Sequence, residues 1–150
     1  MATKAIQQST VSERLITRWE QSTEKLATLA EEFPENKFDY APSKAVRTVS
    51  DVLRHVAFWN FYVADRASEK KADDTGNELS KDQFSTKKQI VDALKRSSSA
   101  ALKGLNQHRS GFTPEIAEML VTFIEHTCEH YGQLVVYARL NGIVPPSSRG

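Results

Sequence analysis

Two histidines, His126 and His130, stand four residues apart in a segment, residues 121–141, that contains one glycine and no proline. Such a segment favours a helix, in which positions four apart project from the same face. The segment is apolar on nearly every side, which predicts a helix buried within a bundle. A buried imidazole needs a partner, because an unsatisfied buried polar group is costly. The pair is therefore either two hydrogen-bonded core histidines or two ligands of one metal ion.

The remainder of the chain shows three more segments with the apolar periodicity of amphipathic helices. We expect the first helix to run from Ser9 or Ser12 to about Glu32, with Val11, Leu15 and Trp19 on its apolar side, after a loose start over residues 1–8. Threonine or serine caps predict the other boundaries: a second helix from Thr48 or Ser50 to about Glu69, a third from Ser85 or Thr86 to Leu105, and a fourth from Thr113 to Asn141. Residues 67–85 are polar and are expected to form a solvated connection. Four helices without an alternating strand pattern predict an all-α, four-helix bundle, a single domain over residues 1–150.

Composition narrows the classes of function. A formal net charge of +1 gives no electrostatic case for binding nucleic acid or an anionic membrane. No apolar run is long enough to span a bilayer, and residues 1–8 lack the apolar core of a signal peptide. The single cysteine, Cys128, excludes an internal disulfide and indicates a reducing compartment, the cytoplasm.

A third histidine, His55, falls on the same side of the second helix as Val52, Val56 and Trp59. Three imidazoles on two helices of one bundle match a catalytic zinc-type site, which has three protein ligands and an open position. Cys128 is not expected to be a ligand, because two steps along a helix turn it by about 200 degrees from either neighbouring histidine; we interpret it as a small buried apolar residue. His108, in the break after the third helix, is interpreted as an exposed loop residue. The aromatic residues of the second helix are expected to be mostly core packing: Phe58, Trp59, Phe61 and Tyr62.

Residues 126–130, His-Thr-Cys-Glu-His, also match the inverted zinc-peptidase pattern, in which Glu129 would be the general base. Those peptidases need a further acidic ligand downstream. No Asp or Glu follows His130 in this chain. The peptidase interpretation therefore fails.

Three patches together carry a family resemblance: Thr-Val-Ser-Asp-Val-Leu-Arg-His-Val-Ala at 48–57, His-Thr-Cys-Glu-His-Tyr-Gly-Gln at 126–133, and Val-Tyr-Ala-Arg-Leu-Asn-Gly-Ile-Val-Pro-Pro at 136–146. The chain resembles the DinB/YfiT superfamily of metalloenzymes. The resemblance implies an up-down-down-up bundle that binds a divalent metal through His55, His126 and His130. It also implies frequent dimerisation, hence a homodimer, and kinship to maleylpyruvate isomerase and to transferases that use bacillithiol or mycothiol.

The chemistry expected of such a site is activation of a bound thiol or water by the metal, for attack on a small electrophile. The electrophile would lie in a cleft roofed by Trp59 and Tyr62. The acids nearby in sequence are Asp51, Glu125 and Glu129, and both Asp51 and Glu129 are candidates for an outer-sphere or substrate contact. Asp51, one turn before His55, is the best of them, although helix capping explains it equally well. Gln133, one turn beyond His130, is placed to bond a ligand imidazole or a substrate.

A non-catalytic alternative stays open: a stress-related dimeric bundle whose metal is structural or absent. A structural zinc site is normally closed by four protein ligands, and this chain offers three histidines, unless a dimer partner supplies the fourth ligand. Zinc and nickel are the metals we expect first. Manganese and iron also accept imidazole ligands.

Overall fold

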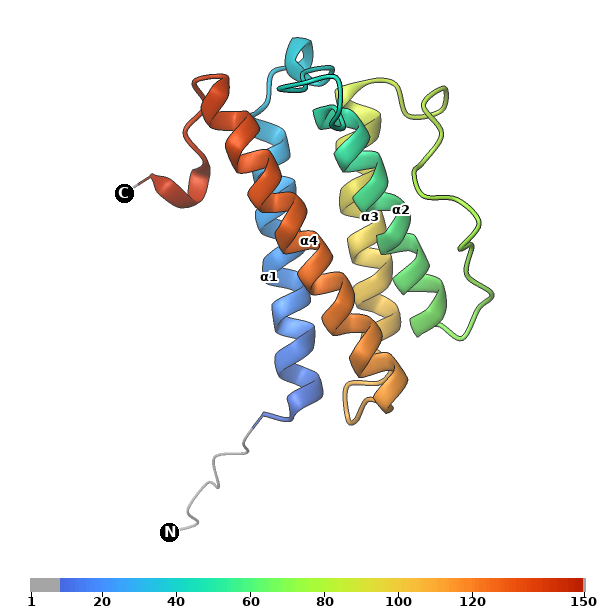
Figure 1. The fold of residues 1–150 in the computed structure, drawn as a ribbon. Helices are drawn as coiled ribbons and strands as arrows, with labels where there is room; N and C mark the ends of the chain where they lie inside the picture. The colour runs from blue at the N-terminus through green and yellow to red at the C-terminus, as the bar shows by residue number, and fades with distance from the viewer. Residues whose placement is uncertain (1–8, 150) are drawn as a thin grey trace.

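The computed structural model describes residues 9–149, so the loose start expected for residues 1–8 lies outside the described part. Residues 9–149 contain no strand, and the four helices run up, down, down and up, as the resemblance implied (Figure 1). α1 packs against α3 and α4, and α2 also packs against α3 and α4, so that α1 lies diagonally opposite α2 and α3 lies diagonally opposite α4. The helices are α1 (Val11–Glu32), α2 (Val49–Ala67), α3 (Lys87–Asn106) and α4 (Pro114–Leu140), with short 3-10 turns η1 (Glu35–Lys37) and η2 (Pro146–Ser148).

A threonine precedes each of the four helices and accepts a hydrogen bond from the first turn: Thr10, Thr48, Thr86 and Thr113. This bond satisfies one of the backbone N–H groups that a helix start leaves free. The predicted caps at Thr48, Thr86 and Thr113 are confirmed. The predicted start of α1 at Ser9 or Ser12 is wrong, because Thr10 forms a reciprocal capping box with Glu13.

The core consists of two apolar clusters stacked along the bundle, one around Leu26, Val52 and Leu134 and one around Trp19 and Leu120. Burying one such aliphatic side chain contributes about 1.5–3 kcal/mol. α2 and α3 approach closely at Gly104, where an added Cβ would lie 2.8 Å from the Ser68 hydroxyl and 3.2 Å from the Ala64 carbonyl. The clusters hold α2 against α4, and this packing sets the position of the histidines.

Burial differs from expectation on two helices. Val11 of α1 is exposed, because it lies in the first turn beyond the end of the core, and Ile16 is buried instead. The aromatic run of α2 is not core packing. Its members are only partly buried, since small and aliphatic residues such as Val56 and Ala57 occupy the inner face. The aromatic residues concerned are Phe58, Trp59, Phe61 and Tyr62.

The expectation that α4 is buried on nearly every side is wrong. Its buried residues form one stripe, and the opposite side carries exposed apolar side chains, including Val136 at 55% and Leu140 at 60% exposure. This follows from the arrangement of the bundle, in which α4 packs mainly against α1 and α2. None of the helices described combines the length and apolar character that a membrane span needs.

The connection between α2 and α3 is more than a solvated loop. It returns along the bundle from the end of α2 to the start of α3 (Figure 1), and Leu79 and Phe84 pack against the core. The buried Arg54 of α2 holds this connection, donating to the Glu78 carboxylate at 3.1 Å and to the Phe84 carbonyl at 3.0 Å. The connection is thereby fixed against the same part of α2 that carries His55.

The position of His108 also differs from the expectation. It is partly buried rather than exposed, and its Nε2 lies 2.9 Å from the Ala67 carbonyl oxygen. A carbonyl oxygen only accepts, so this nitrogen donates. The bond satisfies one of the carbonyls left free at the end of α2.

Candidate metal centre

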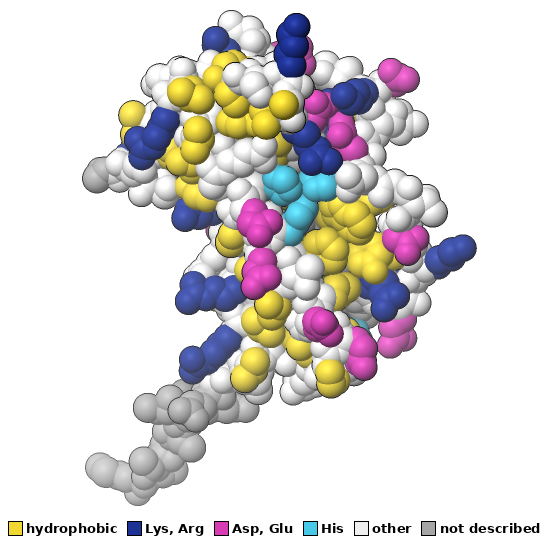
Figure 2. Space-filling view, viewed as in Figure 1, with side chains coloured by type: hydrophobic (Ala, Val, Ile, Leu, Met, Phe, Trp, Pro, Cys, Tyr) yellow, Lys and Arg dark blue, Asp and Glu magenta, His cyan; other side chains and the backbone are white. Residues whose placement is uncertain are grey.

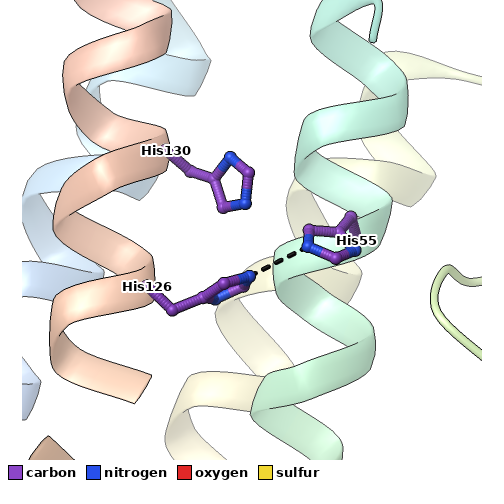
Figure 3. A group of neighbouring side chains, drawn as sticks. All are labelled: His55, His126 and His130. Atoms are coloured by element: carbon purple, nitrogen blue, oxygen red, sulfur yellow. Dashed lines mark hydrogen bonds between the residues drawn. The ribbon is translucent and has the colours of Figure 1, made fainter. Parts of the chain in front are cut away.

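Three imidazoles from two helices lie together in the seam between α2 and α4 (Figure 3). His55 comes from the middle of α2, while His126 and His130 come from successive turns of α4. One ligand nitrogen from each ring lies within 4.8 Å of the others, and the Nε2 atoms of His55 and His126 are 2.9 Å apart. The predicted clustering of the three rings is confirmed. Metal binding by them stays a prediction.

The backbone of the α2–α3 connection sets the tautomer of His55. Its Nδ1 lies 2.6 Å from the carbonyl oxygen of Asn77. Because that oxygen has no proton to give, Nδ1 carries the hydrogen and Nε2 presents its lone pair to the cluster. The side chain of Asn77 also accepts a hydrogen bond from Trp59 Nε1 at 3.0 Å.

A chain of hydrogen bonds sets the tautomer of His130 in the same way. The Tyr137 hydroxyl donates to the Arg47 carbonyl at 3.0 Å, so its oxygen accepts from the Gln133 amide nitrogen at 2.9 Å. Gln133 therefore turns its carbonyl oxygen toward His130 Nδ1, at 2.9 Å, and that nitrogen must carry the hydrogen. Nε2 of His130 is left with a free lone pair. This is one of the contacts expected of Gln133, whose role toward a metal remains a proposal.

Burial controls the charge of the three rings. It lowers the pKa of His126 to about 3, with the charges of His130 and His55 adding to the effect. Burial also lowers the pKa of His55 and of His130, although the hydrogen bonds that these rings donate to Asn77 and Gln133 oppose it. All three rings are therefore neutral near pH 7, which is the form that binds a metal ion.

The donor set fits a divalent metal ion. Two ring nitrogens 2.9 Å apart repel each other unless one carries a proton or both bind a cation. With the Nδ1 hydrogens of His55 and His130 engaged outside the cluster, their free lone pairs face inward. Imidazole nitrogens held by outer hydrogen bonds in this manner are the usual ligands of zinc and related divalent metals.

The acids singled out in the sequence lie apart from the rings. Asp51 caps α2 through Thr48 and pairs with Arg54 at 2.6 Å and Lys81 at 2.9 Å, so its bonds are structural. Burial raises the pKa of Asp51, but bonds from Lys81, Thr48 and Arg54 outweigh burial and lower it below its ordinary value. Glu129 is exposed on α4, and no hydrogen bond joins it to a histidine among the described residues.

Cys128 is not among the clustered ligands, in agreement with the helical geometry, but it is exposed rather than buried. The burial prediction is wrong because it assumed that α4 is enclosed on all sides. The exposed thiol lies on the side of α4 that neither α1 nor α2 covers.

Aromatic side chains continue the histidine cluster along the seam. Trp59 stacks on Phe123 with ring centroids 5.5 Å apart, and Phe123 meets the edge of His126 at 5.9 Å. Tyr62 packs against both Trp59 and Phe123. The histidines reach the molecular surface, with hydrophobic side chains gathered directly beside them (Figure 2). Trp59 and Tyr62 therefore lie one ring away from the histidine cluster, through Phe123, and their role as the roof of a substrate cleft stays a prediction.

Sequence reasoning missed Asn77 and Phe123. Asn77 acts through its backbone carbonyl, which any residue would supply, so no side-chain pattern marks it. Phe123 was detectable, because it stands three residues before His126 and shares its face of the helix.

Comparison with known proteins agrees with this geometry. No curated protein matches the chain significantly. A family model described as the DinB superfamily matches residues 18–134, a span that includes the three clustered histidines and Gln133. The chain therefore belongs to the DinB superfamily.

Proposed function

We propose that this protein is a divalent-metal-dependent enzyme that joins a low-molecular-weight thiol to a small electrophile. The observation that carries the proposal is the cluster of His55, His126 and His130, which no fourth His, Cys, Asp or Glu completes within residues 9–149. A centre with three protein ligands keeps a position for a reactant, whereas structural zinc sites are normally closed by four. Family membership and the neutral rings support metal binding at this cluster.

A divalent ion held there would lower the pKa of a bound thiol, or of water, and so supply a nucleophile near pH 7. The protein holds the three imidazoles neutral and oriented, through Asn77 at one ring and Gln133 at another. The thiol sulfur forms the bond to the electrophilic carbon, the leaving group departs with its electron pair, and the thiol proton passes to solvent. With water as the nucleophile, the same arrangement would support hydrolysis.

The nucleophile comes from outside the chain in this proposal. Cys128, the one cysteine, is exposed on another side of α4 and lies outside the cluster. Zinc or nickel is the ion we propose first, since all three donors are imidazole nitrogens, while manganese and iron are the alternatives to test.

We further propose that the protein is a cytoplasmic homodimer. Two exposed apolar side chains one turn apart on α4, Val136 and Leu140, support a contact between copies, because monomers rarely expose large apolar patches to water. The free thiol of Cys128 supports a reducing compartment. Sedimentation of the wild-type chain and of Val136→Glu tests the dimer, which the glutamate should weaken.

The test of function is metal analysis of untagged protein, followed by assays of several thiols with a chromogenic aryl halide. We expect about one divalent ion per chain, and thiol consumption that the chelator-treated protein and His126→Ala both lose. His108→Ala, which removes a histidine outside the cluster, should keep the activity. Bound metal without turnover of any thiol or of water would favour the structural-metal alternative.

A further inference from the structure

A pocket of about 420 Å³ opens beside the histidine cluster, between the second half of α2 and the first half of α4. One wall is apolar and consists of Trp59, Tyr62, Met119 and Phe123. The three aromatic rings contact one another at centroid distances of 5.4–5.6 Å, so they form a continuous wall. This volume is within the usual range of small-molecule sites, roughly 300–1,000 Å³.

Apart from the hydroxyl-bearing Thr122, the rest of the lining is acidic. Asp74, Glu115 and Glu118 border the pocket, and no lysine, arginine or histidine does. None of the three carboxylates takes part in an ion pair within the described chain. The start of α4 contributes a partial positive charge of about half a unit, which three carboxylates exceed. The pocket therefore favours a cation.

We propose that this pocket binds a small organic cation, an ammonium or quaternary ammonium group carried on an apolar body. Aromatic rings attract such cations through their negative faces, and the attraction is strongest where water is partly excluded. The carboxylates at the rim supply the charge complement, and the aromatic wall takes the apolar body. An anionic ligand of the same size would be repelled, and a neutral one would gain only the apolar contact.

The pocket shares its wall with the histidine cluster. Phe123 lines the pocket and also touches His126, while Trp59 lines the pocket and bonds Asn77, whose carbonyl holds His55. A ligand in the pocket thus lies one aromatic ring from the imidazoles. We assign the cation as the non-reacting end of the substrate, and this assignment, unlike the binding itself, rests on the proposed function.

Three matched probes test the binding: 2-phenylethylammonium, 2-phenylethanol and 3-phenylpropanoate, titrated into chelator-treated protein. The indole N–H resonance of Trp59 reports on the pocket. That of Trp19, which is buried and bonds the Ser98 carbonyl, is the internal control. We expect the cation to move the Trp59 resonance with an affinity about tenfold above that of the alcohol, and the anion to have no effect.

The acid-to-amide variant Glu115→Gln/Glu118→Gln should weaken the cation at least about fivefold and leave the alcohol unchanged. Both side chains are exposed, so the fold should persist, which the Trp19 resonance checks. Glu125→Gln, an exposed acid of the same helix outside the pocket, is the matched control. Equal affinity for alcohol and cation, no change in the double variant, or no shift of Trp59 with any probe would each overturn the proposal.

These experiments distinguish a failure of the cation-binding proposal from a failure of the proposed enzymatic function. Cation binding without metal-dependent turnover leaves the pocket assignment standing and removes the proposed function. Turnover of electrophiles in the loaded protein, with no preference for cationic ones, supports the function and rejects the cation as its substrate.

Discussion

The carbonyl oxygen of Asn77 lies 2.6 Å from Nδ1 of His55, so the connection between α2 and α3 sets the tautomer of an imidazole on α2. Gln133 does the same for His130 from within α4. The two rings are thus oriented by different kinds of group, a backbone carbonyl in one case and a side-chain amide in the other. Only the second can be removed by substitution, and that difference makes it the sharper test.

Replacing Gln133 with leucine removes the acceptor from His130 Nδ1 while keeping most of the side-chain volume. Outer hydrogen bonds of this kind are worth about 10–100-fold in metal affinity. We expect a loss in that range, measured by competition with a chromogenic chelator, in a protein that remains folded. Tyr137→Phe, which leaves the Gln133 amide without one acceptor, should lose less. Unchanged affinity in Gln133→Leu would mean that this bond does not support the site.

Removing any one clustered histidine should reduce metal affinity by far more. His55→Ala, His126→Ala and His130→Ala each delete a ligand, yet the apolar clusters that hold the bundle do not include these rings. The controls are His108→Ala and Cys128→Ser, whose side chains lie outside the cluster. Equilibrium dialysis should show wild-type metal content in both controls. Loss of metal in folded Cys128→Ser would contradict the geometry.

Acid should destabilise the metal-free protein through His126. Its pKa, about 3 in the folded state, is below the unfolded value of about 6.5, so the unfolded chain binds the additional proton between these values. The free energy of unfolding should therefore be highest above about pH 6.5 and fall as pH drops. At pH 5 the loss from this ring is about 2 kcal/mol. Asp51 also loses its ion pairs when it is protonated, but that loss of stability occurs at lower pH, below about pH 4.

Urea unfolding of chelator-treated protein at pH 7.5 and pH 5 measures the effect, with His126→Gln as the comparison. The glutamine variant should show a smaller difference between the two pH values. An equal difference in both proteins would show that another group carries the acid sensitivity.

Arg54 links α2 to the connection that carries Asn77. Arg54→Leu should destabilise the fold by about 2 kcal/mol, because the partly buried carboxylates of Asp51 and Glu78 lose their partner. The substitution should also lower metal affinity, because the Asn77 carbonyl that accepts from His55 Nδ1 becomes less well positioned. Chemical denaturation and metal competition give the two readouts. A stability loss with unchanged metal affinity would show that the connection does not support the cluster.

Much of this organisation could be predicted from local sequence. The starts of α2, α3 and α4 followed from threonine caps next to apolar periodicity, and the pairing of His126 with His130 followed from a spacing of one helical turn. The exposed side of α4 could not be predicted, because an apolar run does not show which of its sides the other helices cover. The wrong prediction that Cys128 is buried has the same cause. The role of residues 68–86 was also hidden. Its polar composition suggests solvation, while its contribution to the site is a backbone oxygen.

The most direct test of the account is the melting temperature of the protein at pH 7.5 while a strong chelator is added and zinc or nickel is then returned. An ion that bridges α2 and α4 stabilises the folded state by mass action, since the unfolded chain holds no assembled site. We expect the melting temperature to fall by several degrees with chelator, to recover with about one equivalent of metal, and to stay constant in His126→Ala. A melting temperature that neither the chelator nor added metal changes, in protein without bound metal, would contradict the central claim that the three histidines form a metal site.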